Sequence, residues 1–224
     1  MVIILHIETA TKVCSVAVSG NGELLAFKEN EGLDFSHGEE LTNYIDEVMK
    51  TAGLNYSDLD AISISSGPGS YTGLRIGAAT AKGLCFALNI PLIAIDSLKA
   101  LGNLVKGKYE NLNIAPVIDA RRMEVYNQIY NTGMEPLKPI SADIIEEDSY
   151  AEFEPLVILG DGANKLKELW QGRNIVFEND VASSARGQID LAYNAFQQSD
   201  FVDTAYWEPF YLKDFVAGVK KKGN

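Results

Sequence analysis

Histidine and cysteine, which supply most zinc ligands in proteins, are scarce in this chain of 224 residues, with two of each. Cys14 and Cys85 lie far apart and show no Cys-x-x-Cys spacing, which argues against a disulfide framework and fits a reducing compartment. His37 opens a predicted helix, but Leu41 stands where a His-x-x-x-His pair needs its second histidine, and His6 lies within a predicted strand. We therefore expect no metal site built on histidine or cysteine.

Positive charge is also in short supply, because 19 lysines and arginines face 31 aspartates and glutamates, for a formal net charge of −12. Such a chain repels phosphate backbones and lacks the basic surface of an independent nucleic-acid binder, so contact with RNA or DNA would need a local basic patch or a second protein. The apolar run at residues 2–5 is too short for a signal-peptide core or a membrane span. We expect a soluble cytoplasmic protein with no membrane contact.

The first half of the chain alternates short strands with helices. Residues 13–19 show the two-residue period of a strand, and Gly20-Asn21-Gly22 predicts a hairpin turn after it. The full predicted order is strands 2–8, 13–19 and 23–29, helix 37–52, strand 61–65, helix 72–88, strand 91–96 and a helix from residue 97. Three antiparallel strands followed by alternating helices and strands indicate a ribonuclease-H-like α/β fold, whereas the alternative, a doubly wound sheet, begins with a βαβ unit.

The second half repeats this plan loosely. The predicted elements are a hairpin of residues 114–119 and 124–130, a partly helical acidic stretch at 143–154, strand 156–160, helix 163–170, strand 174–177 and helix 188–198. Two tandem ribonuclease-H-like units define a two-lobed actin-like α/β fold with a nucleotide cleft between the lobes. We place the first lobe at residues 1–105 and the second, degenerate lobe at residues 106–224.

A glycine-rich segment at residues 65–77 joins a predicted buried strand to a helix. Free backbone amides at such a helix start favour anions. The segment is not a phosphate-binding loop of the Gly-x-x-x-x-Gly-Lys-Ser/Thr type, and Gly67-x-Gly69 is followed by Thr72 where a dinucleotide fingerprint has its third glycine. On spacing alone, a tight structural turn is favoured over a phosphate site.

The helix that follows this segment carries small residues at four-residue intervals, at Gly73, Gly77 and Ala81. Each glycine costs up to about 1 kcal/mol relative to alanine in a helix interior, so the ridge needs a compensating contact. Either the ridge packs on the chain's own sheet, or it forms a seam with a second subunit. A seam that includes the 37–52 helix would carry Tyr44 and Arg75 towards the partner.

Catalytic alternatives are incomplete in the sequence. A ribonuclease-H-type nuclease needs converging carboxylates, but only Glu8 and the pair Glu39-Glu40 are suitably placed, and the next strand ends in Ser65-Ser66-Gly67. A kinase of the two-lobed class would place acidic and hydroxyl groups at residues 8–11 and 119–122, where hairpin turns explain them equally well.

Five segments resemble the bacterial TsaB family, also called YeaZ. They are residues 4–11, 14–18, 67–77, 119–126 and 209–213, which together span nearly the whole chain. The glycine-rich segment matches the most specific motif of that family. Glu8 is a departure, because the family usually has aspartate there, and this weakens any Mg²⁺ contact at that position.

The resemblance implies a non-catalytic scaffold subunit that pairs with a metal-bearing TsaD-like subunit and is joined by a TsaE-like ATPase. Such an assembly transfers a threonylcarbamoyl group to adenosine 37 of tRNAs that read ANN codons, and the chain would meet tRNA only through the complex. It implies no cofactor bound tightly by this chain, and the residues leave open whether ATP or ADP sits between the lobes or at the subunit boundary. An exposed apolar seam on the two helices would favour a homodimer when the partner is missing. The alternative is a free-standing ATP-dependent kinase or a glycoprotease-like peptidase of the same fold.

The expected partner interface lies on helices 37–52 and 72–88. Its residues are His37, Leu41, Tyr44, Ile45, Val48, Thr72, Gly73, Arg75, Ile76, Gly77, Ala79 and Thr80. The expected nucleotide or phosphate loops contain Thr9, Thr11, Gly67, Gly69 and Asp119. No catalytic residue and no metal ligand is expected.

Overall fold

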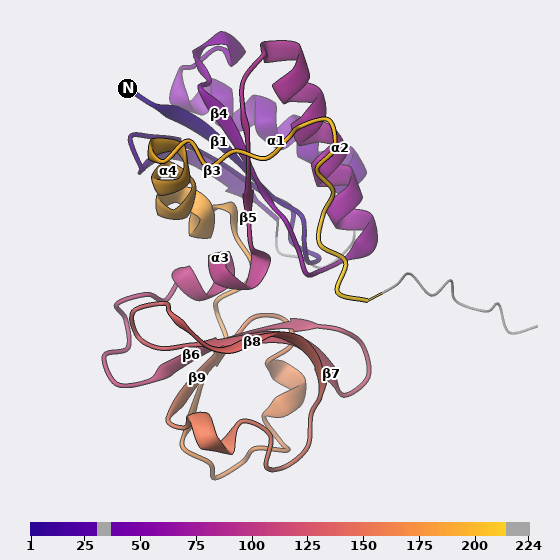
Figure 1. The fold of residues 1–224 in the computed structure, drawn as a ribbon, viewed down its shortest axis with the longest axis vertical. Coiled ribbons are helices and arrows are strands. Elements are labelled where there is room, and N and C mark those ends of the chain that lie inside the picture. Colours follow the sequence, from indigo (N-terminus) through magenta and orange to yellow (C-terminus); the bar gives the residue numbers. More distant parts are fainter. Residues whose placement is uncertain (31–36, 214–224) are drawn as a thin grey trace, which may run out of the picture.

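The computed structural model describes residues 1–30 and 37–213, apart from the side chains of residues 37 and 39. Two lobes, each built on a five-stranded mixed sheet, lie one above the other in Figure 1. None of the helices in the described ranges combines the length and the hydropathy that a membrane crossing requires.

The first sheet has the strand order β3-β2-β1-β4-β5. Its strands are β1 (Ile3–Glu8), β2 (Ser15–Gly20), β3 (Glu23–Glu29), β4 (Ala61–Ser65) and β5 (Leu92–Ile95). The first three strands run antiparallel, and β4 and β5 run parallel to β1. Asn21 and Gly22 have φ values of 51° and 82°, the left-handed conformation that a two-residue hairpin turn requires. The predicted opening meander is confirmed.

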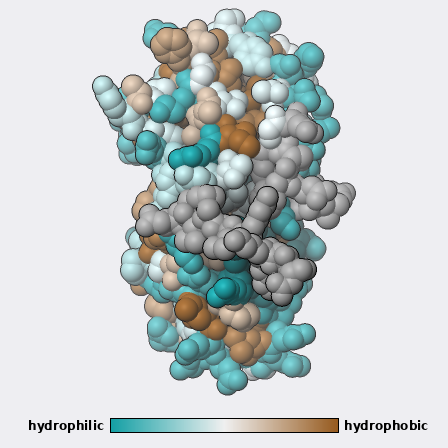
Figure 2. Space-filling model, turned by 90° about the vertical axis from the view of Figure 1, so that its right-hand side faces the viewer, coloured by the Kyte–Doolittle hydropathy of each residue, from teal (hydrophilic) through white to brown (hydrophobic). Residues whose placement is uncertain are grey.

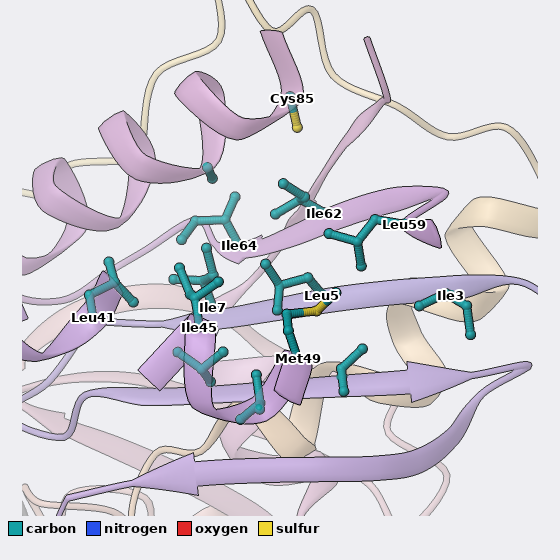
Figure 3. Packing of buried hydrophobic residues seen from close by; sticks show 14 of the residues in the cluster. Ile3, Leu5, Ile7, Leu41, Ile45, Met49, Leu59, Ile62, Ile64 and Cys85 are labelled. Carbon is teal, nitrogen blue, oxygen red and sulfur yellow. The ribbon is translucent and has the colours of Figure 1, made fainter. Parts of the chain in front are cut away.

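Helices α1 (His37–Ala52) and α2 (Tyr71–Leu88) cover one face of this sheet. Helix α1 packs over β2 and β3, and its apolar side chains share one buried cluster with those of β1 and β4, where Figure 3 shows Leu41, Ile45, Leu5 and Ile62. Burial of these side chains stabilises the lobe by about 25 cal/mol per Å² of apolar surface. Gly53, with φ of 69°, ends α1 as the sequence predicts.

The opposite face of the first sheet carries both polar and apolar side chains and is covered by the 3-10 turn η4 (Ala185–Gln188), helix α4 (Ile189–Gln197) and part of α3 (Ser97–Asn103). Gln188 reaches across to β1 and β4, where its side chain donates to the Ile7 carbonyl at 2.8 Å and accepts from Ser63 Oγ at 2.7 Å. Because a buried polar group is costly unless it is hydrogen-bonded, these bonds fix the position of the covering segment.

The second sheet has the order β10-β9-β6-β7-β8, which is the order of the first sheet read from the other edge. Its strands are β6 (Asn113–Asp119), β7 (Glu124–Tyr130), β8 (Pro136–Ile144), β9 (Leu156–Leu159) and β10 (Ile175–Glu178). The same meander followed by two parallel strands thus occurs in each lobe. This repeat confirms the predicted actin-like α/β architecture of tandem ribonuclease-H-like units.

Three elements of the second lobe differ from the sequence prediction. The predicted 163–170 helix is only the short 3-10 turn η3 (Asn164–Leu166) followed by turns, and the acidic stretch contains only the 3-10 turn η2 (Ala151–Phe153). Residues 136–144 form strand β8 despite two prolines, because β8 is an edge strand whose outer side needs no amide donors. Another 3-10 turn, η1 (Tyr56–Asp58), precedes β4 in the first lobe.

The lobe division also differs from the predicted 1–105 and 106–224. After β10 the chain returns to the first lobe, where α4 packs on β5 and β1 and Val202 forms an isolated bridge with Leu92. The last described residues run along α2, as Figure 1 shows in yellow. The first lobe is therefore assembled from both ends of the chain.

Candidate functional site

The glycine-rich segment packs tightly against the turn between β1 and β2. Ser70 N donates to the Ala10 carbonyl at 2.6 Å, and Ser70 Oγ caps the helix by accepting from Gly73 N at 3.2 Å. A Cβ on Gly69 would overlap the Ala10 carbonyl oxygen, and a Cβ on Gly73 would overlap that of Thr9. These glycines allow two stretches of backbone to touch, as the prediction of a structural turn requires.

The ridge of small residues on α2 faces the chain's own core. A Cβ on Gly77 would lie well under 3.0 Å from Thr9 Oγ1 and 2.9 Å from Ile64, and Ala81 is fully buried in the first-lobe core. The expectation that Gly73 and Gly77 contact a partner is therefore wrong. The residues of the ridge are small because β1 and β4 pack closely against this side of α2.

Three expected interface residues of α1 are buried in the same core. Leu41, Ile45 and Val48 are each at most 2% exposed and pack against the first sheet. Helical spacing put them on one stripe correctly, but this stripe is the inner face of an amphipathic helix. Their assignment to a partner interface is also wrong. His37 begins α1, and its side chain lies outside the described residues.

The remaining expected residues lie on the outer side of the two helices. Thr72, Arg75 and Ala79 are exposed on α2. Tyr44, Ile76 and Thr80 are half-buried, with Tyr44 and Ile76 packed against the edge of the core. The Arg75 guanidinium stacks over the Tyr71 ring at 4.2 Å, and a hydrogen bond with Tyr211 raises the pKa of Arg75. The structure therefore brings together six of the twelve expected positions on one accessible face.

A C-terminal segment shares this face, and sequence reasoning did not place it. Residues 203–213, the strap, run along α2. The Lys82 amine donates to the carbonyl oxygens of Ala205 and Trp207, both at 3.1 Å. Phe210 N donates to the Ser66 carbonyl at 2.7 Å. The Phe210 backbone also lies so close to Gly67 that a Cβ on Gly67 would overlap the Phe210 carbonyl oxygen. The only sequence signal for the strap is its resemblance to a family motif.

A cleft of about 450 Å³ separates the lobes, with walls from both. Thr11, Gly69 and Asp119 line it, whereas Thr9 and Gly67 are buried behind it. Asp119 is engaged within the chain, because its carboxylate accepts from Arg121 N at 2.9 Å and pairs with the Lys165 amine at 2.5 Å. In the described ranges, no three His, Cys, Asp or Glu side chains come close enough together to hold a metal ion.

Glu8 points away from this cleft into the polar layer of the first sheet. Its carboxylate accepts from Ala10 N at 2.6 Å, and burial raises its pKa to about 7 although hydrogen bonds from Ser65 and Gln188 oppose the rise. His6 lies two residues earlier on the same face. Its Nδ1 is 2.7 Å from Ser63 Oγ, and its Nε2 is 2.7 Å from Ser19 Oγ. Burial lowers the His6 pKa to about 3, so the imidazole is neutral.

Comparisons with known proteins agree with this architecture. The model of the family described as TsaD, tRNA N6-adenosine threonylcarbamoyltransferase, matches residues 33–206. A Haemophilus influenzae protein named tRNA threonylcarbamoyladenosine biosynthesis protein TsaB is 37% identical, covering 98% of this chain and 97% of its own length. The Escherichia coli protein of the same name is 28% identical, with 98% of each chain covered.

A solved structure supports the same assignment. The structure described as YeaZ from Pseudomonas aeruginosa superposes with a TM-score of 0.79 at 26% identity and covers 95% of this chain and all of its own. Both the sequence and the arrangement of the two lobes are thus shared over nearly the whole length. The chain belongs to the TsaB (YeaZ) family, within the wider group of sequences that the TsaD family model describes.

Proposed function

We propose that the chain is a cytoplasmic, non-catalytic subunit of the machinery that makes N6-threonylcarbamoyladenosine at position 37 of tRNAs reading ANN codons. It activates a metal-bearing TsaD-like subunit by forming a heterodimer with it. The names of its relatives support the tRNA modification. The resemblance described above supports the pairing and the division of labour between the subunits.

The outer face of α2 is the observation that carries the pairing. Thr72, Ala79 and Gly83 are exposed there, and no atom lies within 4 Å of a Cβ built on Gly83. Small outward side chains let a partner helix approach the α2 backbone closely. Because Gly73 and Gly77 lock the inner face of α2 onto the sheet, this surface is rigid and loses little conformational freedom on binding.

The chain's charge fits a division of labour between subunits. With a net charge of −12, it adds little attraction for tRNA, so we assign the tRNA contact to the TsaD-like subunit. A TsaE-like ATPase is the third component. In isolation the chain would pair with a second copy through the same face.

We place ATP or ADP at the subunit boundary and not in this chain's own cleft. The space beside Gly67 is occupied by the backbone of Phe210, and the space beside Gly69 by the backbone of Ala10. The Asp119 carboxylate is paired with the Lys165 amine. Residues that would cradle phosphates are therefore already occupied by the protein itself. Calorimetric titration of the isolated chain with ADP is expected to give no heat of binding, and saturable binding would contradict this placement.

The decisive experiment uses Ala79→Arg, which puts a long charged side chain on the outer face of α2 without disturbing the core. The matched control is Ala151→Arg, on an exposed alanine of the second lobe. Ala79→Arg should abolish co-elution with the TsaD-like subunit and tRNA modification by the reconstituted subunits, and Ala151→Arg should abolish neither. Co-elution of the Ala79→Arg chain would contradict the proposed interface.

The alternative, a free-standing kinase or peptidase, predicts activity without a partner. The purified chain is incubated alone with ATP, and ADP release is followed. We expect no turnover, and robust turnover would overturn the non-catalytic assignment.

A further inference from the structure

A groove of about 750 Å³ lies at the C-terminal end of α2, beyond the residues so far assigned to the interface. It is formed by the last turns of α2, the following loop and the start of the strap. Its lining residues are Lys82, Gly83, Cys85, Phe86, Asn89, Ile90, Pro91, Thr204 and Ala205. Figure 2 shows this side of the molecule, with hydrophobic residues exposed on its upper half.

Two aromatic side chains stand out beside the groove. Phe86 is 88% exposed and Tyr206 is 86% exposed, more than any other large hydrophobic side chain in the described ranges. Phe86 lines the groove, and Tyr206 directly follows its lining residue Ala205. Exposed aromatics beside an apolar depression are typical of a binding surface, because aromatic residues are enriched at the cores of protein interfaces.

We infer that this groove, with Phe86 and Tyr206 on its rim, is the anchor of the heterodimer interface and receives an apolar, uncharged segment of the TsaD-like subunit. The inference rests on the proposed function and extends its interface to the strap. Ala79, Gly83 and Phe86 follow one another at helical spacing on the outer face of α2. The groove is therefore continuous with the proposed interface.

The area that a stable interface needs supports the same occupant. A specific protein–protein interface buries at least about 1,000 Å² in total. The outward residues of α2 before the groove, such as Thr72 and Ala79, are small and supply little of this area. A phenylalanine or tyrosine buries about 150–250 Å², so the two rim aromatics would add substantially to the area that the exposed Arg75 offers on the same face.

The described lining of the groove offers no charged partner to a cationic ligand. Among the described residues that line it, none carries a carboxylate. The one lysine, Lys82, directs its amine to the Ala205 and Trp207 carbonyls and so holds the strap beside α2. This contact holds the backbone on either side of Tyr206 beside α2.

The test is the affinity of the full chain for the purified TsaD-like subunit, measured by calorimetry for Phe86→Ala, Tyr206→Ala and the double variant. The matched control is Ile144→Ala, which removes a side chain that is 74% exposed on the second lobe. We expect each groove variant to bind at least about tenfold more weakly, the double variant about a hundredfold, and the control like wild type. Because these side chains are exposed, unchanged urea midpoints should show that every variant folds.

The other outcomes separate this inference from the proposed function. If Phe86→Ala and Tyr206→Ala bind within twofold of wild type while Ala79→Arg does not bind, the groove inference is overturned and the interface stands. If none of the three substitutions changes the affinity, or the wild-type chain does not bind, both fail. If the groove variants dissociate a homodimer in sedimentation velocity but leave heterodimer affinity unchanged, the occupant is a second copy and the inference is overturned.

Discussion

Replacing Glu8 by glutamine should remove a loss of stability that the wild-type chain undergoes as the pH rises. Burial raises the pKa of Glu8 from 4.5 to about 7. The folded chain therefore keeps a proton that the unfolded chain releases, and the free energy of unfolding falls as the pH rises from 4.5 through about 7. The pKa difference, 7 − 4.5 or about 2.5, corresponds to about 3 kcal/mol at 1.36 kcal/mol for each pH unit.

His6 contributes with the opposite sign. Burial lowers its pKa from 6.5 to about 3, so the stability that comes from the neutral imidazole is present above pH 6.5 and is lost as the pH falls towards 3. Between pH 4.5 and 6.5 the two groups oppose each other in the wild-type chain. Since His6 is present in both proteins, its contribution cancels when the Glu8→Gln variant is compared with wild type.

The assay is urea unfolding of both proteins across a pH series from about 4.5 to 8.5. Glutamine keeps an acceptor for Ala10 N and resembles the protonated carboxyl, so the two proteins should be similar in stability at the acidic end. At the alkaline end the variant should be more stable by up to about 3 kcal/mol. A difference that does not change with pH would refute the raised pKa and the burial argument behind it.

Three further outcomes follow from the packing of the first lobe. Gly73→Val should lower the free energy of unfolding by about 1–3 kcal/mol, because a Cβ there meets the Thr9 carbonyl oxygen. Gly83→Ala should raise the free energy of unfolding by up to about 1 kcal/mol, because a Cβ there meets nothing. Equal urea midpoints for the two variants would contradict the close approach at Gly73. Lys82→Met removes the two hydrogen bonds to the strap. Limited proteolysis should then cleave residues 203–213 faster, while the urea midpoint changes little. An unchanged cleavage rate would show that Lys82 does not hold the strap. His6→Gln should lose less stability than wild type on acidification below pH 6.5, as followed by circular dichroism; parallel curves would count against the buried neutral imidazole.

Local patterns were sufficient to predict the N-terminal part of the first lobe, but not its completion by residues 185–213. Two-residue periodicity, the Asn21-Gly22 turn and the α1 stripe ending at Gly53 all depend on neighbouring residues, and all are confirmed. The second lobe was harder because its helices are reduced to 3-10 turns. Strand β8 contains prolines that are tolerated only because the strand lies at a sheet edge, and edge position is a tertiary property.

The candidate site shows a similar limit. A stripe of small or apolar residues shows that something packs against it, but not whether that neighbour is the chain itself or another protein. For Leu41, Ile45 and Gly77 the neighbour is the first sheet. The exposed Phe86 was overlooked, since exposure of a hydrophobic side chain has no signature in a single sequence.

The return of the C-terminal segment, residues 185–213, to the first lobe has a consequence for synthesis on the ribosome. The sheet that holds His6 and Ser63 is complete once β5 has emerged, yet its cover, residues 185–197, is translated only after the whole second lobe. Until then the polar side chains of that sheet face water, and α2 lacks its strap. The N-terminal lobe therefore reaches its final form last, and a truncated nascent chain cannot present the finished α2 surface.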